Sequence, residues 1–161
     1  MGRTTGGPGY AALRRGRVSL NNHYYLVTTP THQRRPIFRD LTTGRLVVQA
    51  LRAVEPLAPT LCYVVMPDHL HWLMQLYGGV TLDNAVQRVK GRSAREIGRR
   101  WPAARPVWQA GFHDHAVRAD QDLRTLARYV VTNPLRAGLV ERIGDYPLWD
   151  AVWVEDGRAG G

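Results

Sequence analysis

Apolar and polar positions fall along the chain in blocks of strand or helix length. β-branched and aromatic residues cluster from Tyr24 to Thr29, before Pro30, which predicts a strand. From Leu41 to Val54 apolar residues recur at helical spacing, and Pro56 closes the run. The first part of the chain is therefore predicted to form one strand followed by one helix.

Two further strand-length runs follow, from Thr60 to Met66 and from His69 to Leu76. Only Pro67-Asp68 separates them, which predicts neighbouring strands joined by a tight turn. Thr81 is then suited to cap a second helix that runs to about Gly98.

The last part of the pattern predicts a strand from Val107 to Phe112, resuming towards Val117, and a third helix from Gln121 to Val131. Asp120 is the expected cap of that helix, and Pro134 can open a short further turn. The order of these elements indicates an α+β fold, an antiparallel sheet with helices packed on it.

The composition fits one folded domain. The chain has 161 residues, of which 44% are hydrophobic. We expect a flexible basic arm over 1–18, the domain over 19–154 and a loose tail over 155–161. Cys62 is the only cysteine, the apolar runs are too short to span a membrane, and the N-terminus lacks the apolar core of a secretory signal. A cytoplasmic protein without contact to membranes is the simplest expectation.

The net charge of +9 is carried almost entirely by arginine, with Lys90 the one lysine. Arginine offers a planar fork of donors that matches phosphate oxygens, so a nucleic-acid partner is expected. Solubility, or a genome rich in arginine codons, would produce the same charge. The candidate contacts to DNA are Arg34, Arg35, Arg88, Lys90, Arg92, Arg95, Arg128 and Arg136.

The motif His69-Leu70-His71 is the most specific indication of chemistry in the sequence. Residues two apart on a strand project from the same face, so both imidazoles would point at one spot, with Leu70 turned the other way. Such a pair can share a metal ion, although two histidines on a half-solvated sheet would give the same pattern.

A second pair, His113-Asp114-His115, lies beyond the second helix. Four histidines in two pairs could build a zinc site, or the second pair could be a polar strand end or a loop that faces DNA. The sequence does not fix the two pairs near each other.

Tyr129 stands out among the seven tyrosines because Arg124, Arg128 and Arg136 are near it in the sequence. Phenols are weak nucleophiles unless cations or a metal favour the phenolate. An amphipathic tyrosine at the edge of an apolar helix stripe is the simpler interpretation of Tyr129 taken alone.

These features occur together in a known arrangement. Met66-Pro67-Asp68-His69-Leu70-His71 resembles the metal-binding strand of the REP-associated tyrosine transposases, a branch of the HUH single-tyrosine transposases. Two more stretches are similar to hallmarks of that family. They are Val107-Trp108-Gln109-Ala110-Gly111-Phe112 with Asp114-His115, and Tyr129 followed by Asn133-Pro134-Leu135-Arg136-Ala137-Gly138-Leu139. The resemblance spans about Tyr24 to Val140, and His113 departs from it where an aromatic residue is usual.

The resemblance implies a ferredoxin-like fold of the HUH endonuclease type. It also implies a Mg²⁺ or Mn²⁺ ion held by His69, His71 and, four residues after the tyrosine, Asn133. Tyr129 would attack single-stranded DNA at a hairpin, form a 5′-phosphotyrosine and allow rejoining without ATP, as monomer or homodimer. Two alternatives stay open at this point: a hairpin-binding protein that no longer cuts, and a zinc hydrolase that uses both histidine pairs.

Overall fold

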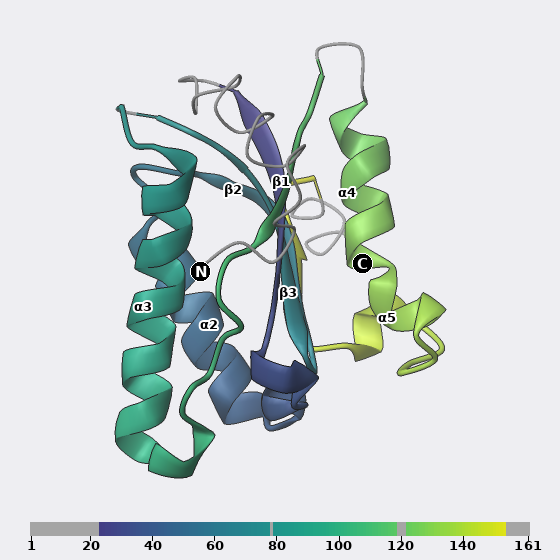
Figure 1. Cartoon of the computed structure of the whole chain (residues 1–161). Coiled ribbons are helices and arrows are strands. Elements are labelled where there is room, and N and C mark those ends of the chain that lie inside the picture. The colour runs from purple at the N-terminus through teal and green to yellow at the C-terminus, as the bar shows by residue number, and fades with distance from the viewer. Residues whose placement is uncertain (1–22, 78, 119–121, 154–161) are drawn as a thin grey trace.

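The computed structural model describes residues 23–77, 79–118 and 122–153. The predicted basic arm and C-terminal tail lie outside these residues. Figure 1 shows a central sheet, seen nearly edge-on, with helices on both faces. No helix in the described part of the chain is both long enough and apolar enough to cross a membrane.

The sheet contains five strands: β1 (Tyr24–Pro30), β2 (Thr60–Met66), β3 (His69–Gln75), β4 (His113–Ala116) and β5 (Trp149–Ala151). All neighbouring strands are antiparallel, in the order β4-β1-β3-β2-β5. The first four strands have the ferredoxin-like order, with one helix after β1 and another after β3. The α+β prediction is confirmed, and β5 adds an edge strand that the sequence pattern had not indicated.

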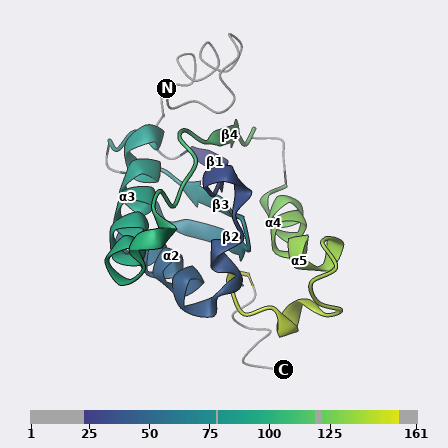
Figure 2. The ribbon, with the colours of Figure 1, turned by 60° about the horizontal axis from the view of Figure 1, so that its bottom comes forward.

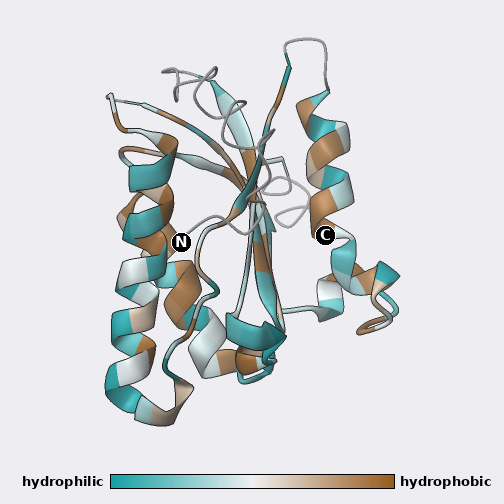
Figure 3. Cartoon of the chain, in the orientation of Figure 1, coloured by the Kyte–Doolittle hydropathy of each residue, from teal (hydrophilic) through white to brown (hydrophobic). Residues whose placement is uncertain are grey.

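Helices α2 (Leu41–Ala53) and α3 (Leu82–Arg100) cover one face of the sheet. Asp40 caps α2 by accepting a hydrogen bond from the backbone N–H of Thr42, and Thr81 caps α3 in the same way from Asn84. Their apolar stripes meet alternate residues of β1, β2 and β3 in the main core. Figure 3 shows this amphipathic pattern, with hydrophilic residues on the outer side of α3.

Helices α4 (Leu123–Val131) and α5 (Asn133–Arg136) lie on the opposite face, as Figures 1 and 2 both show. Ala127, Val130 and Val131 pack in a second, smaller cluster with the residues of β2 and β3 that point away from α2 and α3. Asp122 caps α4, because its carboxylate accepts from the N–H of Arg124. The predicted cap, Asp120, lies outside the described residues.

The strand predicted from Val107 to Phe112 is wrong. This segment makes a single isolated bridge between Trp108 and Thr31, and the regular strand begins only at His113. Two tertiary interactions bend the segment towards α3. The ammonium of Lys90 donates to the backbone carbonyls of Gln109 and Gly111, and the indole of Trp108 donates to Ser93.

Short 3-10 turns complete the chain, at His32–Arg34, Ile37–Arg39, Pro102–Ala104 and Ile143–Asp145. The first of these carries Gln33 and Arg34 at a φ of 55°, in the left-handed region. The turn places Arg34 beside the connection between β2 and β3, where its Nε lies 3.1 Å from a carboxylate oxygen of Asp68.

Candidate active site

The two histidines of the His-Leu-His motif lie on the central strand β3 and point to the face that carries α4. Leu70 and Trp72 belong to the core beneath α2 and α3, whereas Leu73 belongs to the cluster beneath α4. Side chains alternate along a strand, so His69 and His71 share the face of Leu73. The predicted common face of the two imidazoles is confirmed.

The two imidazoles converge edge to face. Their Nε2 atoms are 3.1 Å apart, and the ring planes make an angle of 83°. The second nitrogen of each ring, Nδ1, makes a hydrogen bond to a neighbouring side chain. Nδ1 of His69 lies 2.7 Å from a carboxylate oxygen of Asp68, and Nδ1 of His71 lies 2.8 Å from the hydroxyl of Thr28.

This arrangement fits a shared metal ion. An ionised carboxylate only accepts hydrogen bonds, so Nδ1 of His69 carries the proton and Nε2 presents its lone pair. Metal-binding histidines are commonly oriented by such outer partners. Two nitrogens bound at a right angle to one ion, each about 2.1 Å from it, would be about 3.0 Å apart. The observed separation of 3.1 Å matches that geometry.

Burial favours the neutral form of both rings, which is the form that binds a metal. Burial lowers the pKa of His71 to about 3, and positive charge at His69, Arg136 and Arg34 acts in the same direction. Burial also lowers the pKa of His69, although the hydrogen bond and charge of Asp68 oppose it. The pKa of Asp68 is itself lowered, since His69 and Arg34 outweigh the effect of burial.

The sequence had not identified Thr28 as part of this site. Thr28 is 43 residues from His71 in the chain and meets it because β1 and β3 pair with these two residues opposite each other. Asp68 was visible within the motif, but its role as the partner of His69 depends on the turn between β2 and β3.

Within the described residues, no group of three His, Cys, Asp or Glu side chains is placed to hold one metal ion. His113 and His115 lie on β4, at the edge of the sheet, and do not form one cluster with His69 and His71. Asn133 begins α5, which lies against β2, the strand next to β3. The structure therefore brings Asn133 to the correct face of the sheet, and its role as a third ligand stays a prediction.

Tyr129 is near the end of α4 and is 60% exposed, on the side of the helix away from the small core. The guanidinium of Arg136 stacks over its ring, with Cζ 4.0 Å from the ring centroid. The same guanidinium donates to the backbone carbonyl of Tyr129 at 2.6 Å and to the hydroxyl of Thr132 at 2.7 Å. The charge of Arg136 also lowers the pKa of His71. Arg136 therefore interacts with both Tyr129 and the histidine pair.

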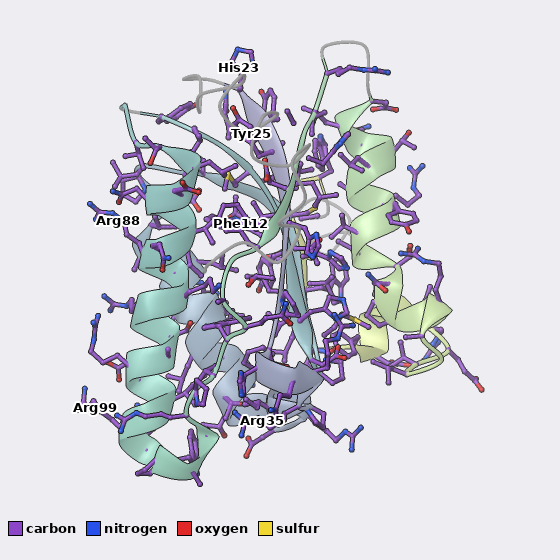
Figure 4. The ribbon with its side chains drawn as sticks, viewed as in Figure 1. His23, Tyr25, Arg35, Arg88, Arg99 and Phe112 are labelled. Atoms are coloured by element: carbon purple, nitrogen blue, oxygen red, sulfur yellow. The ribbon has the colours of Figure 1, made fainter. Side chains whose placement is uncertain are left out.

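The candidate DNA contacts divide into two groups on opposite faces of the sheet. Arg34 and Arg136 lie near the histidine pair, and Arg128 is exposed on α4, which covers the same face. The exposed residues Arg88, Arg92 and Arg95 lie on α3, on the other face of the sheet. The latter three line a groove of about 290 Å³ between α2 and α3. Figure 4 shows Arg88 and Arg99 projecting from α3 away from the sheet.

Two of the predicted contacts have structural roles. Lys90 is buried, and its ammonium is bonded to two backbone carbonyls, so its prediction as a DNA contact is wrong. The guanidinium of Arg35 donates to the carbonyls of Ala104 and Pro106, and thereby ties the turn after β1 to the segment after α3. Figure 4 shows Arg35 near this turn.

A family model and two curated relatives match this chain. The model of the family "Transposase IS200 like" matches residues 19–133. A REP-associated tyrosine transposase of Escherichia coli is 32% identical over 87 residues, which cover 53% of this chain and 50% of that protein. A protein of Haemophilus influenzae assigned to the same group is 30% identical over 98 residues, or 55% of this chain and 56% of that protein.

Among solved structures, a REP-associated tyrosine transposase bound to a REP hairpin superposes with a TM-score of 0.72 at 21% identity. The match covers 88% of this chain and 83% of that chain, and it shows the common fold. The chain spans about half the length of the curated relatives it matches. On the family match over 19–133, the chain belongs to the IS200-like transposase family.

Proposed function

We propose that this chain cuts single-stranded DNA at the foot of a hairpin and rejoins it through a covalent bond to Tyr129. The observation that carries the proposal is the convergence of two neutral imidazoles, with Nε2 atoms 3.1 Å apart, on the sheet face covered by the helix of Tyr129. The relatives named as tyrosine transposases, and the structural relative bound to a REP hairpin, support the choice of substrate.

A divalent cation, Mg²⁺ or Mn²⁺, held by His69 and His71 with Asn133 as third ligand, would polarise a non-bridging oxygen of the scissile phosphate. The protein supplies the rest. The oxygen of Tyr129 forms a bond to phosphorus while the bond from phosphorus to the 3′-oxygen breaks. The phenol proton passes to solvent, which reaches the exposed tyrosine. The product is a 5′-phosphotyrosine and a free 3′-hydroxyl, and the reverse reaction restores the strand.

Arginines provide the sequence-independent affinity for the DNA backbone. Arg136 and Arg34 place positive charge beside the histidines, where the scissile phosphate would lie. Arg88, Arg92 and Arg95 offer a second basic surface behind the sheet, suited to the phosphates of a hairpin stem.

The structure argues against one of the two alternatives. A zinc hydrolase built on four histidines needs them in one cluster, and no cluster of three or more metal-binding side chains of the His, Cys, Asp and Glu types occurs in the described ranges. A hairpin-binding protein without cutting activity would retain the basic surfaces but has no use for the paired imidazoles.

Incubation of the protein with hairpin DNA and Mn²⁺ tests the proposal. With a label on the 3′ side of the cut, the label should become attached to the protein and survive boiling in detergent. Perfect duplex should give little product, because the attacked phosphate must bend into line with the tyrosine. Equal cutting of duplex, or release of label without an adduct, would identify an ordinary nuclease instead.

A further inference from the structure

The second histidine pair has an imidazole in the same row of side chains as His71. His113 on β4 pairs with Thr28 on β1, and Thr28 pairs with His71 on β3. Directly paired residues of antiparallel strands point to the same face of a sheet. His113, Thr28 and His71 therefore follow one another across the face that carries α4.

His113 and Tyr129 lie on opposite sides of His71. Helix α4 packs against β2 and β5, which follow β3 in one direction, whereas β1 and β4 follow it in the other. Neighbouring strands are about 4.8 Å apart, so two strand spacings put the Cα atoms of His113 and His71 about 10 Å apart. The gap between these two positions is bridged only by the short side chain of Thr28.

Thr28, the residue between the two histidines, is short, and its hydroxyl is held at Nδ1 of His71. The His113 side chain is exposed and makes no hydrogen bond to any side chain in the described part of the protein. An imidazole so placed is available to a bound strand of DNA.

The in-line geometry of the proposed reaction sends the leaving oxygen towards this side of His71. In phosphoryl transfer the attacking and leaving oxygens are roughly in line on opposite sides of phosphorus. A phenol that approaches from the side of β2 therefore drives the 3′-oxygen out towards β1 and β4. The departing oxygen carries the electron pair of the broken bond and must take a proton.

We propose that His113 is the general acid that protonates the departing 3′-oxygen, and that the same imidazole removes this proton when the strand is rejoined. In cleavage the imidazolium gives its proton to the 3′-oxygen and becomes neutral. In rejoining the neutral ring accepts the proton of the 3′-hydroxyl, whose oxygen attacks the phosphotyrosine and releases Tyr129. Histidine side chains change charge near neutral pH, which suits both roles. The inference rests on the proposed function.

A substrate with sulfur in place of the bridging 3′-oxygen separates this role from all others, because a departing thiolate needs no proton. Single-turnover cleavage of the oxygen substrate by His113→Gln should be slower than wild type by about 100-fold. With the 3′-sulfur substrate the same variant should come close to the wild-type rate. His115→Gln is the matched control, since His115 is exposed on the same strand and face but pairs with Leu26, one row away. This control should match wild type on both substrates.

Equal slowing of His113→Gln on both substrates would make His113 a DNA-positioning residue and overturn the inference, as would an unchanged rate on the oxygen substrate. Hairpin binding measured in EDTA should be unaltered in His113→Gln, and loss of binding would assign His113 to DNA contact instead. If the wild-type protein forms no adduct with either substrate, the proposed function itself is contradicted, which distinguishes the two failures.

Discussion

The guanidinium of Arg136 lies over the ring of Tyr129, with 4.0 Å between Cζ and the ring centroid, and donates to the backbone carbonyl of the same residue at 2.6 Å. A planar side chain thus fixes both the ring and the end of the helix that carries it. A cation at the C-terminus of a helix also interacts favourably with the helix dipole.

Arg136→Lys should therefore impair cleavage more than binding. Lysine keeps the charge, but it cannot stack on the ring and bond to two oxygens at once. Misplacement of a nucleophile by about 1 Å can cost about 100-fold in rate, and we expect a loss of about 10- to 100-fold in single-turnover cleavage. Hairpin affinity should stay within a few-fold of wild type, and Arg142→Lys, at an exposed position, serves as control. Wild-type cleavage by Arg136→Lys would show that the stack has no part in the reaction.

Thr28 offers a test of the metal site that leaves both histidines in place. Thr28→Val removes the hydroxyl at Nδ1 of His71 and keeps the shape of the side chain. Loss of such an outer partner typically weakens metal affinity by about 10- to 100-fold. Calorimetric titration with Mn²⁺ should show this loss, and His71→Ala should abolish both binding of the ion and cleavage. Unchanged Mn²⁺ affinity in Thr28→Val and in His71→Ala would contradict the assigned site.

The arginines behind the sheet should affect binding and not chemistry. Simultaneous replacement of Arg88, Arg92 and Arg95 by glutamine should weaken hairpin binding and lower the slope of log affinity against log salt by about 2 to 3. At saturating DNA the rate of adduct formation should equal that of wild type, because these residues are on the opposite face from Tyr129. An unaltered salt dependence would remove α3 from the DNA interface.

Lys90 gives the protein a distinctive dependence of stability on pH. Burial lowers the pKa of its ammonium from 10.5 to about 8. Between these values the unfolded chain holds the proton and the folded chain does not, so the free energy of unfolding rises with pH from about 8. Above pH 9 the thiol of Cys62, whose pKa burial raises from 9.0 to about 12, acts in the opposite direction.

Urea unfolding at closely spaced pH values between 7.5 and 9 measures this effect. Because Lys90 is the only lysine in the chain, Lys90→Met isolates its contribution. The variant should be less stable, since two carbonyls lose their donor, and its stability should lack the rise seen in the wild type. An identical rise in the variant would show that another group is responsible.

Local patterns were sufficient to predict β1, β2, β3, α2 and α3 because apolar periodicity and capping residues are written within each segment. They failed at Val107 to Phe112. That segment has the composition of a strand, yet Lys90 binds the carbonyls of Gln109 and Gly111, which are 19 and 21 residues away in the chain. The hydrogen bonds of Lys90 thus explain both why this lysine is buried and why Val107 to Phe112 does not form the predicted strand.

The face shared by His69 and His71 was predictable from alternation alone. The bond between Thr28 and His71 was not, because these residues meet only through the register of β1 and β3, and the same holds for the place of His113 in this row, which depends on the register of β1 and β4. In the same way, the separation of the arginines onto two faces depends on how α3 and α4 pack, which no charge pattern reveals.

Tyr129→Phe tests the central claim most directly. The substitution removes one oxygen from a ring that is 60% exposed, so the free energy of unfolding should change by less than about 0.5 kcal/mol. The variant should bind Mn²⁺ and hairpin DNA like wild type and form no covalent adduct, a loss of several orders of magnitude in rate. Tyr77→Phe, at another exposed tyrosine, should form the adduct normally. If Tyr129→Phe still becomes attached to the 3′-side label, or cuts at the wild-type rate, Tyr129 is not the nucleophile and the proposed function is wrong.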